Sequence, residues 1–279
     1  MPPFAPFPDL RPGVFVERPN RFLTRVLLDG PPGRPMGDPV EAHLPDPGRL
    51  RELLVPGRRV LVRPVPPPPS GKPLRRTRFT LVLVETPDRK GWVSLDTTLP
   101  NRLVGEALAE GVMGEFDGWR LDRAEVRHGA SRFDFRLVRQ EPEPAPSPSS
   151  GAEPPSVASS AAEVPPVTSR GAETSTFLYL EVKSVTLVEE GRALFPDAVT
   201  ARGARHLGEL AELARQGTAT AILFVAQRDD VREIEAARSI DPAFAEALAE
   251  ARRAGVRVYG RRCRVSAAGV ELLNPVPVV

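Results

Sequence analysis

The segment 177–187 is an apolar run interrupted by one charged pair, Glu181 and Lys183. Side chains alternate across a β-strand, so both charges project from the same face, and a charged pair costs free energy in a strand that otherwise reads as core. A carboxylate beside an ammonium on a buried sheet suits a metal-dependent phosphodiesterase: the carboxylate holds a divalent cation, and the lysine reaches the attacking water or the phosphate. The alternative is an ordinary ion pair on a half-exposed strand. The opposite face is apolar and carries Leu178, Leu180 and Val182.

Lysine is rare in this chain. Among 38 lysines and arginines, only Lys72, Lys90 and Lys183 are lysine. Arginine presents a fixed fork of donors and stays protonated, whereas lysine is a compact charge whose pKa can shift. A lysine at position 183 therefore favours a role that arginine cannot fill.

Composition narrows the class of protein. No apolar run approaches the roughly 18 residues of a membrane span, and the first residues lack a basic region followed by an apolar core, so we expect neither a membrane partner nor a signal peptide. The single cysteine, Cys263, excludes an internal disulfide, and the three histidines at no metal-ligand spacing argue against zinc. The expected compartment is the cytoplasm.

The charge is unevenly distributed along the chain. Residues 1–84 hold 14 Lys and Arg against 7 Asp and Glu, a net of +7, so the other 195 residues carry −5 of the overall +2. A basic front half joined to a mildly acidic rear half fits an anion-binding module attached to a second unit. The alternative is that these arginines only decorate a solvated surface.

Residues 1–90 are predicted to form a small basic barrel of the OB or SH3-like kind. Short strands separated by Pro- and Gly-rich turns, with no good helix between them, are typical of such barrels. The expected strands lie at 13–28 (two strands that turn at Pro19-Asn20), 39–44, 58–63, 79–85 and 91–95.

Residues 91–279 are predicted to form a mixed α/β domain with the order helix, three strands, helix, strand, helix, strand. Helical spacing and stop signals place the elements, with Asp241 as the N-cap of the last helix and Gly255 as its stop. The expected ranges are 102–110, 121–127, 131–138, 177–187, 200–216, 219–227, 242–254 and 256–265.

A segment of unusual composition interrupts this domain. Residues 140–176 contain eight prolines, five glutamates and no aromatic residue. Such a segment cannot bury enough apolar surface to offset its ordering entropy, so it is predicted to be disordered. Because it lies between two strands, it is interpreted as an overgrown hairpin loop, which costs little free energy.

Asp134 is the predicted partner of the charged pair. It lies between Phe133 and Phe135, which are expected to point together into a core while Asp134 points the other way. Its strand should pair with the Glu181 strand across the insert. Two carboxylates and a lysine on adjacent strands of a helix-then-three-strand unit form the PD-(D/E)xK arrangement of restriction-endonuclease-like nucleases. Asp134 and Glu181 are thus predicted to bind Mg²⁺ or Mn²⁺, beside Lys183.

Further residues are candidates for the metal site or for contacts to nucleic acid. The candidates outside the barrel each have an ordinary alternative as a solvated or strand-terminal polar group. Glu106, on the first predicted helix, is a candidate third acidic ligand. The candidates for phosphate or nucleic-acid contacts are His43 and Arg49 in a Pro- and Gly-rich turn, Arg202, Arg205 and His206 on a helix, and Gln227 at a strand end.

Several stretches of the chain together match one known family. These stretches are His43–Arg49, Pro100–Leu103, Ser131–Phe135, Tyr179–Leu187, Ala193–Ala198, Arg202-Gly203 and His206-Leu207. They resemble the sugar fermentation stimulation protein A family of bacteria and archaea. The resemblance implies an N-terminal OB-like domain, a C-terminal nuclease-like domain, DNA binding and a role in regulating sugar metabolism, notably that of maltose. This chain has Asp46-Pro47 where the family usually has Asn-Thr, and Asp46 repels phosphate; the 140–176 insert is also unusual.

The predicted fold is therefore α+β: an OB-like β-barrel followed by a restriction-endonuclease-like α/β domain. Two functions compete: a nuclease that depends on Mg²⁺ or Mn²⁺, and a non-cleaving DNA-binding regulator that keeps the nuclease fold as a scaffold. A weaker reading is an RNA-processing factor, because an OB barrel accepts either nucleic acid. DNA is the expected partner, and the sequence leaves the oligomeric state open, a homodimer included.

Overall fold

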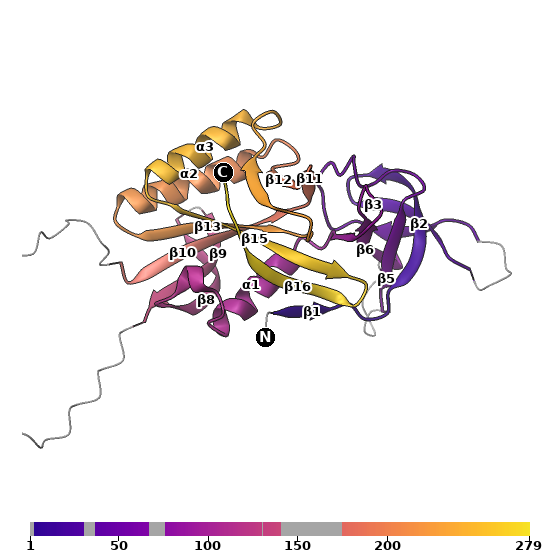
Figure 1. The fold of residues 1–279 in the computed structure, drawn as a ribbon, viewed down its shortest axis with the longest axis horizontal. Coiled ribbons are helices and arrows are strands. Elements are labelled where there is room, and N and C mark those ends of the chain that lie inside the picture. The colour runs from indigo at the N-terminus through magenta and orange to yellow at the C-terminus, as the bar shows by residue number, and fades with distance from the viewer. Residues whose placement is uncertain (1–2, 31–36, 67–75, 130, 141–174) are drawn as a thin grey trace, which may run out of the picture.

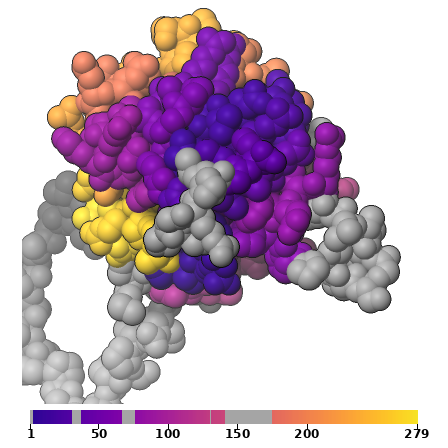
Figure 2. Space-filling view, turned by 90° about the vertical axis from the view of Figure 1, so that its right-hand side faces the viewer, coloured from indigo at the N-terminus to yellow at the C-terminus, as the bar shows by residue number. Residues whose placement is uncertain are grey.

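The computed structural model describes residues 3–30, 37–66, 76–129, 131–140 and 175–279. A barrel at one end of the molecule adjoins a larger sheet that carries helices on both faces (Figure 1). Figure 2 views the molecule from the barrel end, where the barrel's residues cover most of the face. Of the insert predicted at 140–176, residues 141–174 lie outside the described part. No helix among the described residues is long and apolar enough to cross a membrane.

The N-terminal strands form the predicted barrel. Their order in the sheet is β4-β3-β2-β5-β6-β7, and an additional pairing of β4 with β6 closes the first five strands into a ring. Alternate side chains fill its interior, among them Phe15, Leu44 and Leu81. The strands are β2 (Arg11–Asn20), β3 (Leu23–Leu28), β4 (Val40–His43), β5 (Arg59–Pro64), β6 (Phe79–Glu85) and β7 (Trp92–Ser94).

The larger unit is the predicted mixed α/β domain. Its seven strands have the order β1-β16-β15-β13-β10-β9-β8, in which β10, β13 and β15 run parallel and the other neighbours antiparallel. One helix covers one face of the sheet and two cover the other (Figure 1). The strands are β1 (Phe4–Pro6), β8 (Trp119–His128), β9 (Ser131–Arg139), β10 (Phe177–Val185), β13 (Ala219–Ala226), β15 (Arg257–Ser266) and β16 (Gly269–Val276); the helices are α1 (Leu99–Ala109), the short 3₁₀ helix η1 (Gly114–Phe116), α2 (Ala201–Arg215) and α3 (Pro242–Arg253).

The helices begin and end at the predicted signals. The Asp241 side chain accepts a hydrogen bond from the amide of Phe244 (3.0 Å) at the start of α3, and Gly255 follows its end with φ +98°. Gly111, with φ +66°, follows the end of α1 in the same way.

Several short strands were not predicted. β11 (Leu187–Glu189), β12 (Arg192–Phe195) and β14 (Glu233–Ala236) form a small separate sheet, and β1 and β16 extend the large sheet at its edge. All of these except the eight-residue β16 have three or four residues, too few to show a period. At the expected boundary near residue 90, β7 still pairs with β6 of the barrel, whereas β1 pairs with β16 of the larger unit.

The two faces of β10 differ as predicted. Leu178, Leu180 and Val182 pack in the cluster on the α1 side, and Tyr179 packs on the side of α2 and α3. The expectation that Phe133 and Phe135 point the same way was wrong, because Phe135 lies in the α1-side cluster and Phe133 in the other. The β9–β10 ladder ends at the pair Phe135–Leu180, so the alternation relative to β10 does not extend to Phe133.

Candidate functional site

Asp134 lies where β9 separates from β10. The two strands are neighbours, as predicted, and run antiparallel. Their ladder ends at Phe135, the residue that follows Asp134 in the chain. There the Asp134 carboxylate replaces the backbone as acceptor: Oδ2 accepts from the amide of Val182 (2.7 Å), and Oδ1 accepts from Nδ2 of Asn101 on α1 (2.6 Å). The carboxylate is thus fixed between the sheet and the helix.

The environment of Asp134 disfavours its charge. Burial, and next the negative charge of Glu181, raise the pKa of Asp134, and the hydrogen bonds from Val182 and Asn101 only partly offset this. The predicted pair of carboxylates is therefore brought together, close enough for the charge of Glu181 to raise the pKa of Asp134.

Glu181 is buried, with 4% of its surface exposed. Its Oε1 lies 2.5 Å from Nζ of Lys183 and 2.6 Å from Nδ1 of His206 on α2. Burial alone would raise the pKa of Glu181, but the hydrogen bonds and charges of His206 and Lys183 lower it overall. Oε2 is buried and has no hydrogen-bond partner among the described residues.

The carboxylate oxygens of Glu181 and Asp134 suit a hard divalent cation. The unpartnered Oε2 of Glu181 and the carboxylate of Asp134 are oxygen ligands of the kind that Mg²⁺ and Mn²⁺ prefer. Within the described ranges, no group of three or more His, Cys, Asp or Glu is arranged for a metal ion. Two protein carboxylates nevertheless suffice for Mg²⁺, which usually keeps several waters and binds substrate phosphate.

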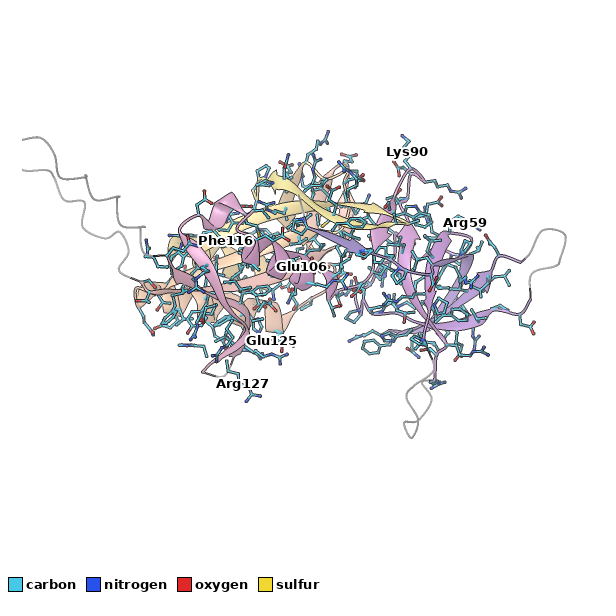
Figure 3. The ribbon with its side chains drawn as sticks, turned by 90° about the horizontal axis from the view of Figure 1, so that it is seen from below. Arg59, Lys90, Glu106, Phe116, Glu125 and Arg127 are labelled. Carbon is cyan, nitrogen blue, oxygen red and sulfur yellow. The ribbon has the colours of Figure 1, made fainter. Side chains whose placement is uncertain are left out.

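Glu106 does not join this pair. It is exposed on α1 (Figure 3), and Asn101 is the α1 residue that reaches Asp134. Five residues correspond to about 500° of helix rotation, so Glu106 lies on a different side of α1. Sequence reasoning missed Asn101, although it directly precedes the predicted helix, in one of the stretches that carry the family resemblance.

Two residues predicted to meet nucleic acid are buried instead. His206 lies on the inner face of α2 and holds Glu181. Gln227 directly follows β13, is 1% exposed, and donates through Nε2 to the carbonyl of Asp96 (3.1 Å) and to Oγ of Ser184 (2.9 Å). Gln227 therefore ties the end of β10 to the segment before α1.

A cavity of about 690 Å³ lies between the barrel and the α/β domain. The barrel contributes Arg18, Arg21 and Arg49, and the other wall includes Ser184, the residue after Lys183. Arg49 thus lines the same cavity as Ser184, which follows Lys183 in the chain. His43 is half-buried on β4, where it pairs with Leu23 and Thr80, and it does not line this cavity.

The turn predicted to display Arg49 is held by two carboxylates. Oδ1 of Asp46 accepts from the amide of Gly48 (2.8 Å), and Oδ2 of Asp197 accepts from the amide of Arg49 (2.8 Å). Asp46 is 8% exposed. Its burial, together with the charge of Asp197, raises its pKa to about 6 despite the hydrogen bond from Gly48. The side chain of Arg18 donates to the carbonyl of Arg49 (2.9 Å).

Arg202 and Arg205 are exposed on the first half of α2, as a phosphate-binding role requires. Both line a second hollow, of about 380 Å³, which lies between α2 and the β8–β9 hairpin. His206 also lines it. The second hollow is therefore separated from Glu181 by a single side chain, that of His206.

Both the barrel and the α/β domain contain a segment that matches a known family of domains. Residues 16–95 match the family described as the SfsA N-terminal OB domain, and residues 168–269 match the sugar fermentation stimulation protein RE domain. The first match ends just after β7, in agreement with the sheet of the barrel.

Relatives of full length confirm the assignment. A sugar fermentation stimulation protein homolog of Moorella thermoacetica is 38% identical over 265 residues, covering 95% of this chain and 94% of the relative. One of Shouchella clausii is 39% identical over 273 residues, covering 98% of both. The solved structure of Pyrococcus furiosus SfsA in complex with Ca²⁺ has a TM-score of 0.74 at 25% identity, covering 100% of this chain and 99% of that one. The chain therefore belongs to the sugar fermentation stimulation protein family.

Proposed function

We propose that this protein binds nucleic acid and hydrolyses phosphodiester bonds at Asp134, Glu181 and Lys183 with the help of Mg²⁺ or Mn²⁺. The observation that carries the proposal is the buried oxygen Oε2 of Glu181, which has no partner among the described residues. A buried carboxylate oxygen without a hydrogen bond costs free energy, which a bound cation would offset.

Each residue has a distinct part. Asp134 and Glu181 would hold the cation, which when bound supplies Lewis acidity toward the phosphoryl group and its attacking water. His206 fixes Glu181 from the buried side. The side chain of Lys183 is 14% exposed, so its ammonium lies at the solvent edge, where it can donate to a phosphate oxygen as negative charge develops there.

Two observations support the partner and the cofactor. The interdomain cavity is lined by arginines of the barrel and by Ser184, which follows Lys183, so a nucleic-acid strand bound in it would lie next to the site. DNA is the proposed partner, and RNA is its alternative. The Pyrococcus relative was solved with Ca²⁺, which supports a divalent cation in this family.

Cleavage assays test the proposal. Purified protein is incubated with single- and double-stranded DNA and RNA in the presence of Mg²⁺ or Mn²⁺. We expect cleavage that falls about 100-fold or more in Asp134→Asn and Lys183→Ala, because each removes a group that acts in the transition state. Lys90→Ala removes an equal charge from the barrel surface (Figure 3) and should cleave normally. The nuclease proposal is rejected if the parent protein does not cleave, or if Asp134→Asn and Lys183→Ala cleave as well as the parent.

A second candidate is a nucleic-acid-binding regulator that does not cleave. It is favoured by the contacts of Glu181, because Lys183 and His206 already lie at hydrogen-bond distance from its Oε1. Such a protein should bind DNA with an affinity that falls linearly with salt on a log–log plot. Asp134→Asn should then leave both binding and any effect on sugar metabolism unchanged.

A further inference from the structure

The hollow beside α2 is rich in arginine. Its walls come from two elements that are distant in sequence, the tip of the β8–β9 hairpin and the first two turns of α2. Figure 3 shows Arg127 near the far end of the hairpin, beyond the body of the sheet. The hollow is lined by Arg127, Gly129, Ser131, Arg132, Arg202, Arg205 and His206.

These arginines are only partly neutralised. Arg132 lies 3.5 Å from Glu125, and Arg205 lies 3.9 Å from Glu209, long contacts between mostly exposed groups that bind weakly. Arg127 and Arg202 have no ion-pair partner in the described ranges. Four guanidiniums against two carboxylates leave a formal charge of +2 around a hollow of about 380 Å³.

Residues next to the carboxylate pair line both the hollow and the interdomain cavity. His206 lines the hollow and contacts Glu181. Ser184, one residue beyond Lys183, lines the interdomain cavity, as does Thr200 just before α2. The candidate site therefore adjoins a residue of each of the two cavities.

We propose that the hollow binds the terminal phosphate of a nucleic-acid strand. An internal phosphodiester carries one negative charge, whereas a terminal phosphate monoester carries about −1.5 to −2 at neutral pH and so matches the formal charge of the hollow. Arginine forks bind phosphate oxygens in pairs. The rest of the strand would lie along the interdomain cavity, with a bond near its end over Asp134 and Glu181. This proposal rests on the proposed function and assigns it a substrate, a strand with a phosphorylated end.

Binding measurements without cleavage test the proposal. Oligonucleotides of one sequence, as DNA and as RNA, carry a hydroxyl at both ends, a phosphate at the 5′ end or a phosphate at the 3′ end. Fluorescence anisotropy of an internal dye is measured in EDTA at fixed salt. We expect one phosphorylated end to bind about tenfold more tightly than the hydroxyl form, since charge-assisted hydrogen bonds are lost without it. The end that is preferred identifies the source of the phosphate.

The double variant Arg127→Gln/Arg202→Gln should lose this preference. Both side chains are exposed and lack ion pairs in the described part of the chain, so the fold should be retained. The matched control is Arg238→Gln/Arg253→Gln, which removes the same charge from exposed positions beside α3 and should keep the preference.

Three results would overturn the proposal: no preference in the parent protein, a preference that survives the double variant, or a double variant that weakens binding to all oligonucleotides equally. The outcome is separate from that of the nuclease proposal. A preference for a phosphorylated end without cleavage in Mg²⁺ supports phosphate binding in the hollow and rejects the nuclease proposal. Cleavage without such a preference supports the nuclease proposal and rejects phosphate binding in the hollow.

Discussion

Nδ1 of His206 lies 2.6 Å from Oε1 of Glu181, and both side chains are almost completely buried. Lys183 contacts the same oxygen. Two donors on Oε1 leave Oε2 without a partner in the described structure, so α2 and β10 together fix the direction in which the carboxylate presents its free oxygen. His206 thus acts through Glu181 as a positioning residue.

Removing His206 should destabilise the fold and disorient the carboxylate. His206→Ala leaves a buried carboxylate without one of its two donors, and we expect a loss of about 1–3 kcal/mol in the free energy of unfolding. His206→Asn, whose Nδ2 can take the position of Nδ1, should recover part of that loss. Urea denaturation of the parent and the two variants measures the free energy of unfolding. Equal denaturation midpoints would show that the contact between His206 and Glu181 does not stabilise the fold.

Asp134→Asn should separate stability from metal binding. Because the pKa of Asp134 is raised, the stability it contributes is full below its unfolded pKa and is lost as pH rises through its folded pKa. At pH 7 without metal, the variant should therefore be as stable as the parent or more stable, provided that Asn101 turns its amide to suit the new side chain.

The same variant should not respond to metal. Mn²⁺ should raise the melting temperature of the parent, because a ligand that binds only the folded state stabilises it, and should leave Asp134→Asn unchanged. Thermal unfolding at increasing Mn²⁺ concentration measures both. An equal rise in the two proteins would place the cation elsewhere.

Part of the candidate site could be predicted from the sequence. Strand alternation placed Glu181 and Lys183 on one face of β10, and the interpretation of the insert as a hairpin loop identified β9 as the neighbouring strand. The side-chain contacts that support these residues could not be predicted in this way. Asn101 contacts Asp134 across a helix–sheet interface, and His206 was assigned to phosphate because its burial depends on how α2 packs.

Polar residues at the ends of strands were interpreted least well. Gln227 follows a strand that was correctly predicted, yet its side chain points into the protein and bonds to Ser184. Hydropathy cannot distinguish a polar end that meets solvent from one that joins two neighbouring elements. The turn at Arg49 shows the same limit, because its acceptor, Asp197, comes from the other domain.

Asp46 should make the stability of the protein depend on pH. Its folded pKa of about 6 exceeds the model-peptide value of 3.8, so its contribution is full below 3.8 and is lost as pH rises through 6. Asp46→Asn removes that loss, since the amide oxygen still accepts from Gly48. We expect the variant to be more stable than the parent at pH 7, by up to about 3 kcal/mol, with a difference that shrinks toward pH 4.

Denaturation at several pH values checks this expectation. Asp38→Asn, at an exposed position of the barrel, serves as the control and should follow the parent. If Asp46→Asn and Asp38→Asn have the same pH profile, the buried Asp46 carboxyl is not the group that makes stability depend on pH in this range.

Gly48 should tolerate no side chain while Asp197 is present. A Cβ at position 48 would overlap Oδ2 of Asp197 and lie 2.9 Å from Oδ1 of Asp46, so Gly48→Ala must push the turn away from the other domain. We expect a loss of about 1–3 kcal/mol in the free energy of unfolding.

Asp197→Ala alone also destabilises the protein, because the amide of Arg49 loses its acceptor. In the double variant, however, the methyl group enters the space that the carboxylate left, and its cost should be smaller than the sum of the two single losses. A double-mutant cycle measures this coupling; strictly additive losses would mean that the two domains do not meet at Gly48 and Asp197 in solution.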